Sequence, residues 1–282
     1  MRDYVFIADF FTENGILGGG ELNNDECIKI LQNRGRTVKK INSFHVTSSF
    51  VETYLGSKFI ISNFVALDPE VYKILRDRAK YIIYEHDHKY LKTRDPSPFK
   101  DFIAPPDQLI NLDFYKNAIA VLCQSSMHKN IVKSNIKTEN IINLGGNLWS
   151  DQILDFLEEL SSAEKEEKCS VMNSRNSIKN TYFCAKYCER KELNYELIPE
   201  TSYKEFLQNL SKNNTFVFFP ETAETLSRVV VECRMMGIKV ITNKLVGATS
   251  EPWFKLKGKE LVNLLRKKRK EIVDVVEEVF KK

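Results

Sequence analysis

The chain has 282 residues, with 42 Lys and Arg against 38 Asp and Glu, so its formal net charge is +4. Residues 255–282 hold ten basic and five acidic side chains, which leaves the rest of the chain at −1. This distribution argues against a nucleic-acid binder that is basic over its whole surface, but it permits a local basic patch. The 43% hydrophobic and 28% charged content excludes a disordered or fibrous chain.

The length suits one large domain or two domains of about 100 to 150 residues each. No apolar run approaches the roughly 18 to 20 residues that cross a bilayer, and no secretory segment is recognisable, so we expect a soluble, cytoplasmic protein. The six cysteines are scattered through apolar segments and are predicted to be reduced thiols. Cys184 and Cys188 lie four residues apart, but a second pair of metal ligands is missing nearby in the sequence.

Short apolar or β-branched runs alternate with longer stretches of helical period in the first half of the chain. This alternation is typical of parallel sheets built from βαβ units. Helices are predicted over residues 21–34, 69–78 and 128–134. The predicted strands are residues 4–9, 37–41, 58–62, 81–84, 120–124 and 140–144. We therefore expect a Rossmann-like domain over residues 1–148.

A second, smaller alternation follows an amphipathic helix at residues 149–160 and a charged connector at 161–168. The predicted strands are residues 169–172, 195–198, 215–219 and 239–242. The predicted helices are residues 179–191, 203–211 and 224–236. The second domain is expected over residues 149–258. Residues 259–282 form a basic segment whose helix, at 259–280, has one apolar face to bury.

Ligands of open parallel sheets bind beyond the carboxyl ends of the strands, so the loops after the strands are the places to search. The first strand is followed by Gly15-Ile16-Leu17-Gly18-Gly19-Gly20-Glu21 and then a helix. Glycines allow close approach of the backbone, and a helix N-terminus presents amides suited to an anion. The spacing is not that of a dinucleotide fingerprint, and a tight strand-to-helix turn explains the glycines equally well.

The fourth strand leads into Glu85-His86-Asp87-His88-Lys89-Tyr90, which offers groups for acid–base work or for a metal. His86 and His88 would point in opposite directions if the strand continued, so a polar active-site loop is favoured over a metal site. In the second half, Arg175 and Lys179 follow a strand where a helix should begin. They could clamp a diphosphate, or they could be ordinary solvated side chains.

Glu224 and Glu232 lie eight residues apart, a little over two turns at about 3.6 residues per turn, so one helix would place them along one face. Glu232 follows the apolar run Val229-Val230-Val231, and a carboxylate in such a position needs a polar partner. The vicinal diol of a ribose is a natural one.

Together these features resemble family 4 of the glycosyltransferases with the GT-B fold, as a compact, phage-like member. Glu224 and Glu232 match the E-x7-E element of that family, after a strand that ends in Phe219-Pro220. His86-Asp87 is similar to its post-strand His-Asp. The other matches, in chain order across residues 5–255, are Gly19-Gly20-Glu21 with Leu31, Gly35 and Val38, then Arg175 with Lys179-Asn180, then Gly247 and Glu251.

The resemblance implies two Rossmann-like parallel-sheet domains that face each other across a cleft, with the C-terminal helix returning to the N-terminal domain. The N-terminal domain would take the acceptor and the C-terminal domain the donor. The implied activity is retaining transfer of a sugar from a UDP- or GDP-type nucleotide sugar to a hydroxyl group. No cofactor and no metal are expected, and the sequence has no Asp-x-Asp motif.

The resemblance also implies roles for particular residues. Arg175 and Lys179 would neutralise the donor diphosphate, and Glu232 would bind the ribose hydroxyls. The sugar and phosphate would be met by Glu224 and by the amides of Thr225, Leu226 and Ser227. From the opposite domain, the diphosphate would face Gly18, Gly19 and Gly20. The catalytic residues would be His86, Asp87 and Glu224, with His86 or Asp87 near the transferred sugar or the acceptor hydroxyl.

Some positions depart from the pattern of the family. Ser174 or Asn173 stands where a glycine usually precedes the Arg, and Leu226 and Ser227 stand where glycines usually lie between the paired glutamates. The donor pocket is therefore expected to differ in shape.

The acceptor is open between a glycan and a hydroxymethylated base of phage DNA. The run Arg266-Lys267-Lys268-Arg269-Lys270 is either a solvated helix face or a patch that contacts an anionic surface. A non-catalytic nucleotide- or nucleic-acid-binding protein on the same fold is the alternative function. A Rossmann oxidoreductase is disfavoured by the broken glycine fingerprint.

Overall fold

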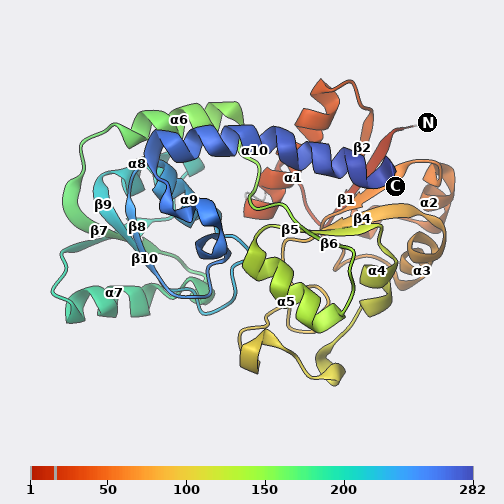
Figure 1. Ribbon diagram of the computed structural model, residues 1–282, viewed down its shortest axis with the longest axis horizontal. Helices are drawn as coiled ribbons and strands as arrows, with labels where there is room; N and C mark the ends of the chain where they lie inside the picture. Colours follow the sequence, from red (N-terminus) through yellow and green to blue (C-terminus); the bar gives the residue numbers. More distant parts are fainter. Residues whose placement is uncertain (1, 16–17, 282) are drawn as a thin grey trace. The chain divides into compact units, whose positions relative to one another are not determined.

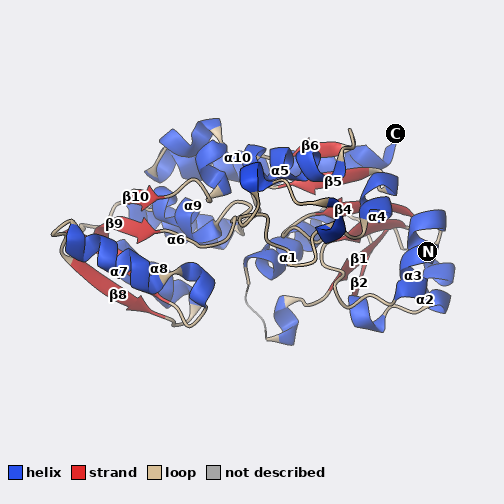
Figure 2. Ribbon diagram, turned by 90° about the horizontal axis from the view of Figure 1, so that it is seen from below, coloured by secondary structure: helices blue, strands red, loops and turns tan. Residues whose placement is uncertain are grey.

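The computed structural model describes residues 2–15 and 18–281, so Ile16 and Leu17 of the glycine loop lie outside the described residues. The chain divides into two compact units (Figure 1). The first, which we call the N-terminal unit, comprises Met1–Leu148 and Lys268–Lys282, and the C-terminal unit comprises Trp149–Lys267. Each unit has its own parallel sheet among helices, and Figure 2 shows the strands in red and the helices in blue.

The sheet of the N-terminal unit contains all six predicted strands, in the order β2-β1-β3-β4-β5-β6 and parallel throughout. The strands are β1 (Tyr4–Ala8), β2 (Val38–Asn42), β3 (Lys58–Ile61), β4 (Lys80–Tyr84), β5 (Ala120–Cys123) and β6 (Ile141–Asn143). The central strands are apolar on both faces because helices cover both sides of the sheet.

Side chains that alternate along each strand enter two separate cores. In β1, Val5 and Ile7 face one core, whereas Tyr4, Phe6 and Ala8 face the other. The first core is closed by α2 (Ser48–Tyr54), α3 (Pro69–Arg78), α4 (Leu112–Asn117) and α5 (Ser126–Ile136). The second is closed by α1 (Gly19–Asn33) and the later part of α10 (Gly258–Glu278). The short helices α2 and α4 were not predicted, because six or seven residues show too little helical period.

The sheet of the C-terminal unit has the order β10-β9-β7-β8, again parallel, and contains the four predicted strands. They are β7 (Glu166–Asn173), β8 (Tyr195–Pro199), β9 (Asn213–Phe218) and β10 (Lys239–Thr242). One face is covered by α7 (Thr181–Arg190). The other face is covered by α6 (Asp151–Ser161), α8 (Tyr203–Ser211), α9 (Arg228–Met235) and the first part of α10. Strand β7 extends into the predicted connector, because Glu166 already pairs with Asn213 ahead of a β-bulge.

Helix α10 contributes to both units. Leu261 and Leu265 are buried in the core of the C-terminal unit, whereas Ile272 and Val276 are buried against α1 in the N-terminal unit. Arg34 of α1 fixes the second part through hydrogen bonds from Nη1 to Asp274 at 2.8 Å and Glu277 at 2.7 Å. The predicted return of the C-terminal helix to the N-terminal domain, with its apolar face hidden, is confirmed.

The basic run of α10 is not one uniform solvated face. Arg266 forms ion pairs with Asp151 and Asp155 of α6, at 3.1 and 2.8 Å, inside the C-terminal unit. Arg269 forms an ion pair with Glu26 of α1 inside the N-terminal unit and is only 13% exposed. Two of the five cations proposed for an anionic surface therefore hold the helix in place, and contact with such a surface stays a prediction for Lys267, Lys268 and Lys270.

All six cysteines are buried and unbridged. Within residues 2–15 and 18–281, the structure shows no helix that is both long and apolar enough to span a membrane. The same part of the chain contains no group of three or more His, Cys, Asp or Glu side chains placed to hold a metal ion.

We expect Ile272→Ala to destabilise the N-terminal unit by roughly 2–5 kcal/mol, because it leaves a cavity between α10 and α1. Hydrogen exchange of the amides of α1 and β1 gives the local free energy of opening. The matched control is Glu278→Ala, at an exposed position of the same helix, which should change that free energy by less than about 0.5 kcal/mol. Equal effects of the two substitutions would show that the contact between α10 and α1 contributes little.

Candidate functional site

The strand order of each sheet reverses beside its first strand. In the N-terminal unit β1 lies between β2 and β3, and in the C-terminal unit β7 lies between β8 and β9. Ligands of open parallel sheets bind at such a switch point, beyond the carboxyl ends of the strands. The loops to examine are therefore those after β1 and β3, and those after β7 and β9.

Helix α1 starts at the glycine loop. Gly18 is its N-cap and the exposed Gly19 its first residue. A Cβ atom on Gly18 would collide with the carboxylate of Glu21, which folds back over the helix start. A Cβ atom on Gly20 would lie 3.5 Å from Cγ of His86. Gly18 thus gives the Glu21 side chain room to fold back, whereas a Cβ atom on Gly20 would make only an ordinary contact with His86.

The imidazole of His86 is held on both ring nitrogens. Its Nδ1 lies 2.7 Å from Nε2 of Gln124, and its Nε2 lies 2.8 Å from Oδ1 of Asn24. The amide nitrogen of Gln124 donates, so Nδ1 accepts and the Nε2–H group donates to Asn24. The ring also stacks on Tyr84, with 5.1 Å between centroids. His86 is therefore fixed as the neutral Nε2–H tautomer at the carboxyl edge of the sheet.

Asp87 lies beside two cations, with Lys89 Nζ at 2.5 Å and Arg94 Nη1 at 3.2 Å from its carboxylate oxygens. Burial alone would raise the pKa of this carboxyl, but Lys89 and Arg94 outweigh it, so the pKa lies below the ordinary value. Asp87 is thus kept ionised at neutral pH. It can orient a hydroxyl group or stabilise a positive charge that develops nearby.

Lys89 is the centre of this loop. Its side chain is 2% exposed and donates to Glu85, at 2.7 Å, as well as to Asp87. Burial would lower the pKa of Lys89, but the two carboxylates raise it. Glu85, which is fully buried, also accepts a hydrogen bond from the Tyr115 hydroxyl, and burial raises its pKa. The sequence placed Lys89 in the loop but gave it no role.

His88 points away from His86 into the core. Its Nδ1 lies 2.8 Å from the Tyr90 hydroxyl, and its ring makes an edge contact with His128. Strand β4 ends at Tyr84, so the two imidazoles do not alternate along a strand, and each makes its own hydrogen bonds. Burial lowers the pKa of His88 to about 4 and holds the pKa of His128 well below its usual value.

In the C-terminal unit the loops after β7 and β9 are bonded to each other. Lys179 Nζ donates to Glu224 Oε1 at 2.6 Å, and Asn180 Nδ2 donates to the Phe219 carbonyl at 3.1 Å. Helix α7 begins only at Thr181, so Lys179 lies in a short 3₁₀ turn just before it. The structure thus brings together two residues that lie 45 positions apart in the sequence, at the switch point of this sheet.

Arg175 lies in the same loop with its side chain exposed. Its backbone amide donates to Glu200 Oε1 at 3.0 Å, and the Ser174 hydroxyl donates to the same oxygen. Within the described part of the chain its guanidinium makes no ion pair. Glu200 therefore anchors the loop while the Arg175 side chain stays available to an anion.

The expectation that Glu224 and Glu232 share one helical face is wrong. Helix α9 begins at Arg228, and Glu224 lies ahead of it in a bridge with Val246. Ser227 has φ 72° and ψ 91°, a backbone conformation that a right-handed helix cannot contain. Leu226 is fully buried in the core. The hydroxyl of Ser227, which is 7% exposed, has no hydrogen-bond partner among the described residues.

Glu232 is 2% exposed and is held by partners within its own unit. Its Oε1 accepts hydrogen bonds from Trp149 Nε1 at 2.8 Å and from the Tyr203 hydroxyl at 2.6 Å. The Arg228 guanidinium stacks over Trp149, 4.4 Å from the ring centroid. The Glu232 carboxylate thus has the polar partners that a buried charge needs. Binding of a ribose by Glu232 stays a prediction.

Several solved structures resemble this chain over nearly its full length. HepE from Anabaena, solved in complex with UDP and glucose, is 12% identical, with a TM-score of 0.52 over 97% of this chain and 93% of HepE. WaaG, a glycosyltransferase of lipopolysaccharide biosynthesis, is 10% identical, with a TM-score of 0.53 over 95% and 90%. A UDP-forming trehalose-phosphate synthase from Burkholderia xenovorans is 6% identical, with a TM-score of 0.53 over 99% and 95%.

The fold is GT-B-like. Sequence comparison adds nothing to this result, since no family model and no curated protein matches the chain. At identities near 10% the likeness establishes the GT-B fold, and the chemistry must be argued from the residues.

We expect the N-terminal unit to lose stability as the pH falls from about 6.5 towards 4. His88 and His128 are buried and neutral, whereas unfolded histidine titrates near 6.5, so acid favours the unfolded state by up to about 1.4 kcal/mol per histidine and pH unit. Urea midpoints between pH 5 and 7.5 measure this slope. His88→Gln should flatten it and the exposed control His45→Gln should not; an unchanged slope in His88→Gln would contradict the assignment.

We expect Lys89→Met to destabilise the N-terminal unit by about 3–5 kcal/mol, because it leaves Glu85 buried without its cation. Adding Glu85→Gln should recover part of the loss, so the two substitutions should be coupled in a double-mutant cycle. Denaturant unfolding measures the four free energies. Lys73→Met, which removes only an exposed pair with Glu70, is the control and should cost less than about 1 kcal/mol. Strictly additive effects would show that Lys89 and Glu85 act independently.

Proposed function

We propose that this protein is a glycosyltransferase that moves a sugar from a nucleotide-sugar donor, of the UDP or GDP type, to a hydroxyl group of an acceptor. The observation that carries the proposal is the cluster of Lys179, Glu224 and Arg175 at the switch point of the C-terminal sheet, on a GT-B-like fold. HepE, which has a similar fold, was solved with UDP and glucose.

The electrostatics of this cluster suit a diphosphate. Lys179 contacts the Glu224 carboxylate, and the Glu200 carboxylate anchors the backbone of the Arg175 loop, while the exposed Arg175 guanidinium makes no ion pair within the described residues and can meet an anion. The N-terminus of α9 adds the positive end of a helix dipole beside the Ser227 hydroxyl, which has no hydrogen-bond partner among the described residues. In our proposal the donor takes over Lys179 from Glu224, which frees the Glu224 carboxylate to accept hydrogen bonds from the hydroxyl groups of the sugar.

In the proposed reaction the acceptor oxygen forms a bond to the anomeric carbon, and the bond from that carbon to the diphosphate oxygen breaks. The hydroxyl proton of the acceptor leaves with the nucleoside diphosphate. Negative charge grows on the leaving diphosphate, so contacts from Arg175 and Lys179 strengthen towards the transition state. Two side-chain cations can supply this neutralisation themselves, which supports a metal-independent reaction. Retention of the anomeric configuration rests on the resemblance alone.

Glu232 has a defined place in this proposal. Because Oε1 already accepts from Trp149 and Tyr203, the ribose hydroxyls would have to reach Oε2. The indole and the phenol fix the orientation of the carboxylate before the nucleotide arrives, which lowers the entropic cost of binding.

The acceptor side is proposed to be the N-terminal unit, where His86 and Asp87 stand at the carboxyl edge of β4. The acceptor is a glycan or a hydroxymethylated DNA base. The basic run of α10 gives little support to either acceptor, because Arg266 and Arg269 form ion pairs inside the fold and are not left to bind an anionic surface.

We expect Arg175→Ala and Lys179→Ala each to weaken UDP binding by about 10- to 100-fold, since a hydrogen bond to a charged group is worth about 1.5–3 kcal/mol. Titration calorimetry with UDP and GDP measures the affinity. The control Lys186→Ala removes a nearby exposed charge that pairs with Glu189, and it should bind like the parent. If neither nucleotide binds, or if all three variants bind equally, the proposed donor site is wrong.

Turnover separates the enzyme from a non-catalytic nucleotide-binding protein on the same fold. The parent protein is offered a panel of nucleotide sugars with simple glycans and with DNA that contains hydroxymethylated bases. Mass spectrometry should then detect a product heavier by one sugar residue, together with free nucleoside diphosphate. Donor binding without hydrolysis or transfer to any acceptor would favour the non-catalytic alternative.

A further inference from the structure

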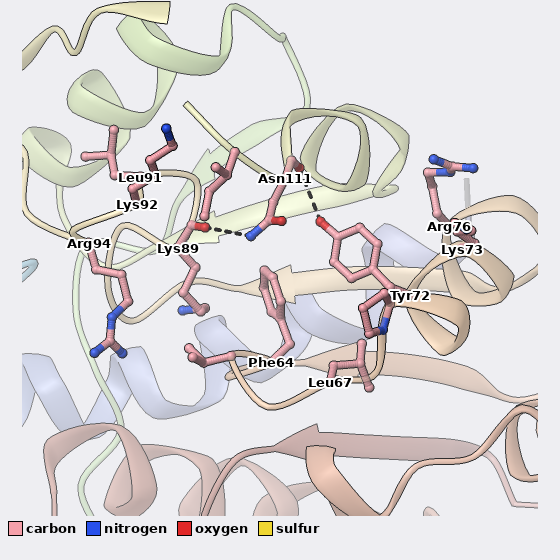
Figure 3. A pocket seen from close by; sticks show the side chains of 13 residues that line it. Phe64, Leu67, Tyr72, Lys73, Arg76, Lys89, Leu91, Lys92, Arg94 and Asn111 are labelled. Carbon is pink, nitrogen blue, oxygen red and sulfur yellow. Dashed lines mark hydrogen bonds between the residues drawn. The ribbon is translucent and has the colours of Figure 1, made fainter. Parts of the chain in front are cut away.

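A pocket in the N-terminal unit lies outside all the residues to which the sequence assigned a role (Figure 3). Its cavity volume is about 480 Å³, within the range of pockets that hold small ligands. The walls come from the loop after β3, from α3, from the loop after β4 and from the residues before α4. The pocket therefore opens near the carboxyl ends of β3 and β4, the edge at which ligands of parallel sheets bind.

The lining of this pocket has one sign of charge. Five of its thirteen residues are Lys or Arg, and no Asp or Glu is found among those that line it in the described part of the chain. The other residues are apolar or aromatic, apart from Asn111. In the described part of the chain, four of the five cations already pair with carboxylates that do not line the pocket, so the unbalanced positive charge that favours an anion is that of Lys92. The apolar share of the wall favours an anion that is attached to a ring or another weakly polar body.

The rings that form the apolar wall are fixed by packing. Tyr72 stacks on Phe114 at 4.1 Å between centroids, and its hydroxyl donates to the Asn111 carbonyl at 3.5 Å. Phe64 packs against Phe114 as well, and Lys89 Nζ lies 5.6 Å from the Phe64 centroid. In Figure 3 the rings of Phe64 and Tyr72 lie between Arg94 on one side of the view and Lys73 with Arg76 on the other. A ligand would thus meet a preformed wall with cations around it.

Two of the cations are accessible to an incoming anion. Lys92 is exposed and has no carboxylate partner in residues 2–15 and 18–281. The side chain of Arg94 is 52% exposed and is 3.2 Å from Asp87. Exposed ion pairs of this kind contribute little, so a phosphate that offers several oxygens can recruit Arg94 at small cost. Lys89, by contrast, is buried and committed to Glu85 and Asp87.

The pocket is linked to the predicted catalytic loop by direct contacts. Lys89 and Arg94 both line the pocket, and both contact the carboxylate of Asp87. An anion bound by Arg94 therefore lies beside the residue that the resemblance places near the acceptor hydroxyl. Occupation of the pocket and the charge around Asp87 are coupled, because Arg94 serves both.

We propose that this pocket is an acceptor subsite for a phosphate-bearing ring of about the size of a sugar phosphate or a nucleotide. The phosphate binds Lys92 and Arg94, and the ring packs against the wall formed by Phe64 and Tyr72. The inference rests on the proposed function, because it names the chemistry of the acceptor, but its test is binding to the N-terminal unit and does not require a donor.

The experiment compares matched pairs of probes by titration calorimetry: glucose with glucose 6-phosphate, and a nucleoside with its 5′-monophosphate. A short single-stranded oligonucleotide and vesicles of anionic phospholipid form two further arms. Because nucleotides can also enter the donor site, nucleotide binding is measured in Arg175→Ala as well. We expect the phosphorylated member of at least one pair to bind at least tenfold more tightly than the other, with an affinity that falls as salt is raised.

The key variant is Lys92→Glu, which reverses an exposed charge and should leave the fold intact. It should weaken the phosphorylated probe at least tenfold, and Arg94→Ala should do the same. Lys116→Glu, at an exposed lysine of α4 outside the pocket, is the matched control and should bind like the parent. UDP binding at the donor site, measured as the part that Arg175→Ala weakens, should be unchanged in all three variants, so that failure of the donor site and failure of this pocket give different results.

Several results would overturn the inference. These are equal affinity for phosphorylated and unphosphorylated probes, binding to vesicles alone, or binding that Lys92→Glu and Lys116→Glu reduce equally.

If the inference holds, the two monophosphate arms and the oligonucleotide arm identify the source of the phosphate. Tight binding of glucose 6-phosphate points to a phosphorylated saccharide, and binding that grows from monophosphate to oligonucleotide points to a nucleic acid strand.

Discussion

The reversal of strand order beside the first strand of each sheet brings the donor loops together in the C-terminal unit and, next to β4, sets the edge at which the N-terminal site lies. It decides which loops meet, because the chain leaves β1 and β3, or β7 and β9, at neighbouring positions of one edge. The loops that meet are joined by polar bonds: the Asp9 carboxylate accepts from the amides of Val65 and Ala66, and Lys179 donates to Glu224. The loops after neighbouring parallel strands begin side by side at this edge. Their amides and side chains are not used in the hydrogen bonds of the sheet, so they can bind a ligand.

Buried charge gives the N-terminal site its character. Removing Lys89 and Glu85 from water is costly, and their mutual attraction offsets this cost only when the remaining hydrogen-bonding groups are satisfied. The Tyr115 hydroxyl satisfies Glu85, and Asp87 completes the shell of Lys89. As a result Asp87 stays ionised and is held in place between Lys89 and Arg94. Such a network is better suited to positioning a reacting group than to stabilising the fold.

The sequence predicted every strand of both sheets, because most of the strands contain a short apolar or β-branched run between turn residues. It missed α2 and α4, which are too short to show a period, and it began α9 four residues early because Ser227 looks helix-compatible. Roles for Gln124, Asn24, Trp149 and Tyr203 were beyond sequence reasoning. Each of these residues reaches His86 or Glu232 from a distant segment, and the hydrogen bonds exist only after the sheets have ordered those segments.

The loop before α9 keeps a backbone conformation with a positive φ although it contains no glycine at Leu226 or Ser227. Ser227 adopts a positive φ outside the left-handed helical region, which costs a non-glycine residue roughly 1–3 kcal/mol, and Leu226 stands at the other position where the resemblance implies a glycine. Leu226 is fully buried in the core, and burying such a side chain contributes about 1.5–3 kcal/mol, which offsets the strain at its neighbour. The amide of Ala248 also donates to the Leu226 carbonyl at 3.0 Å. Packing therefore holds the backbone in a conformation that glycine would adopt freely, and α9 still starts beside Lys179 and Glu224.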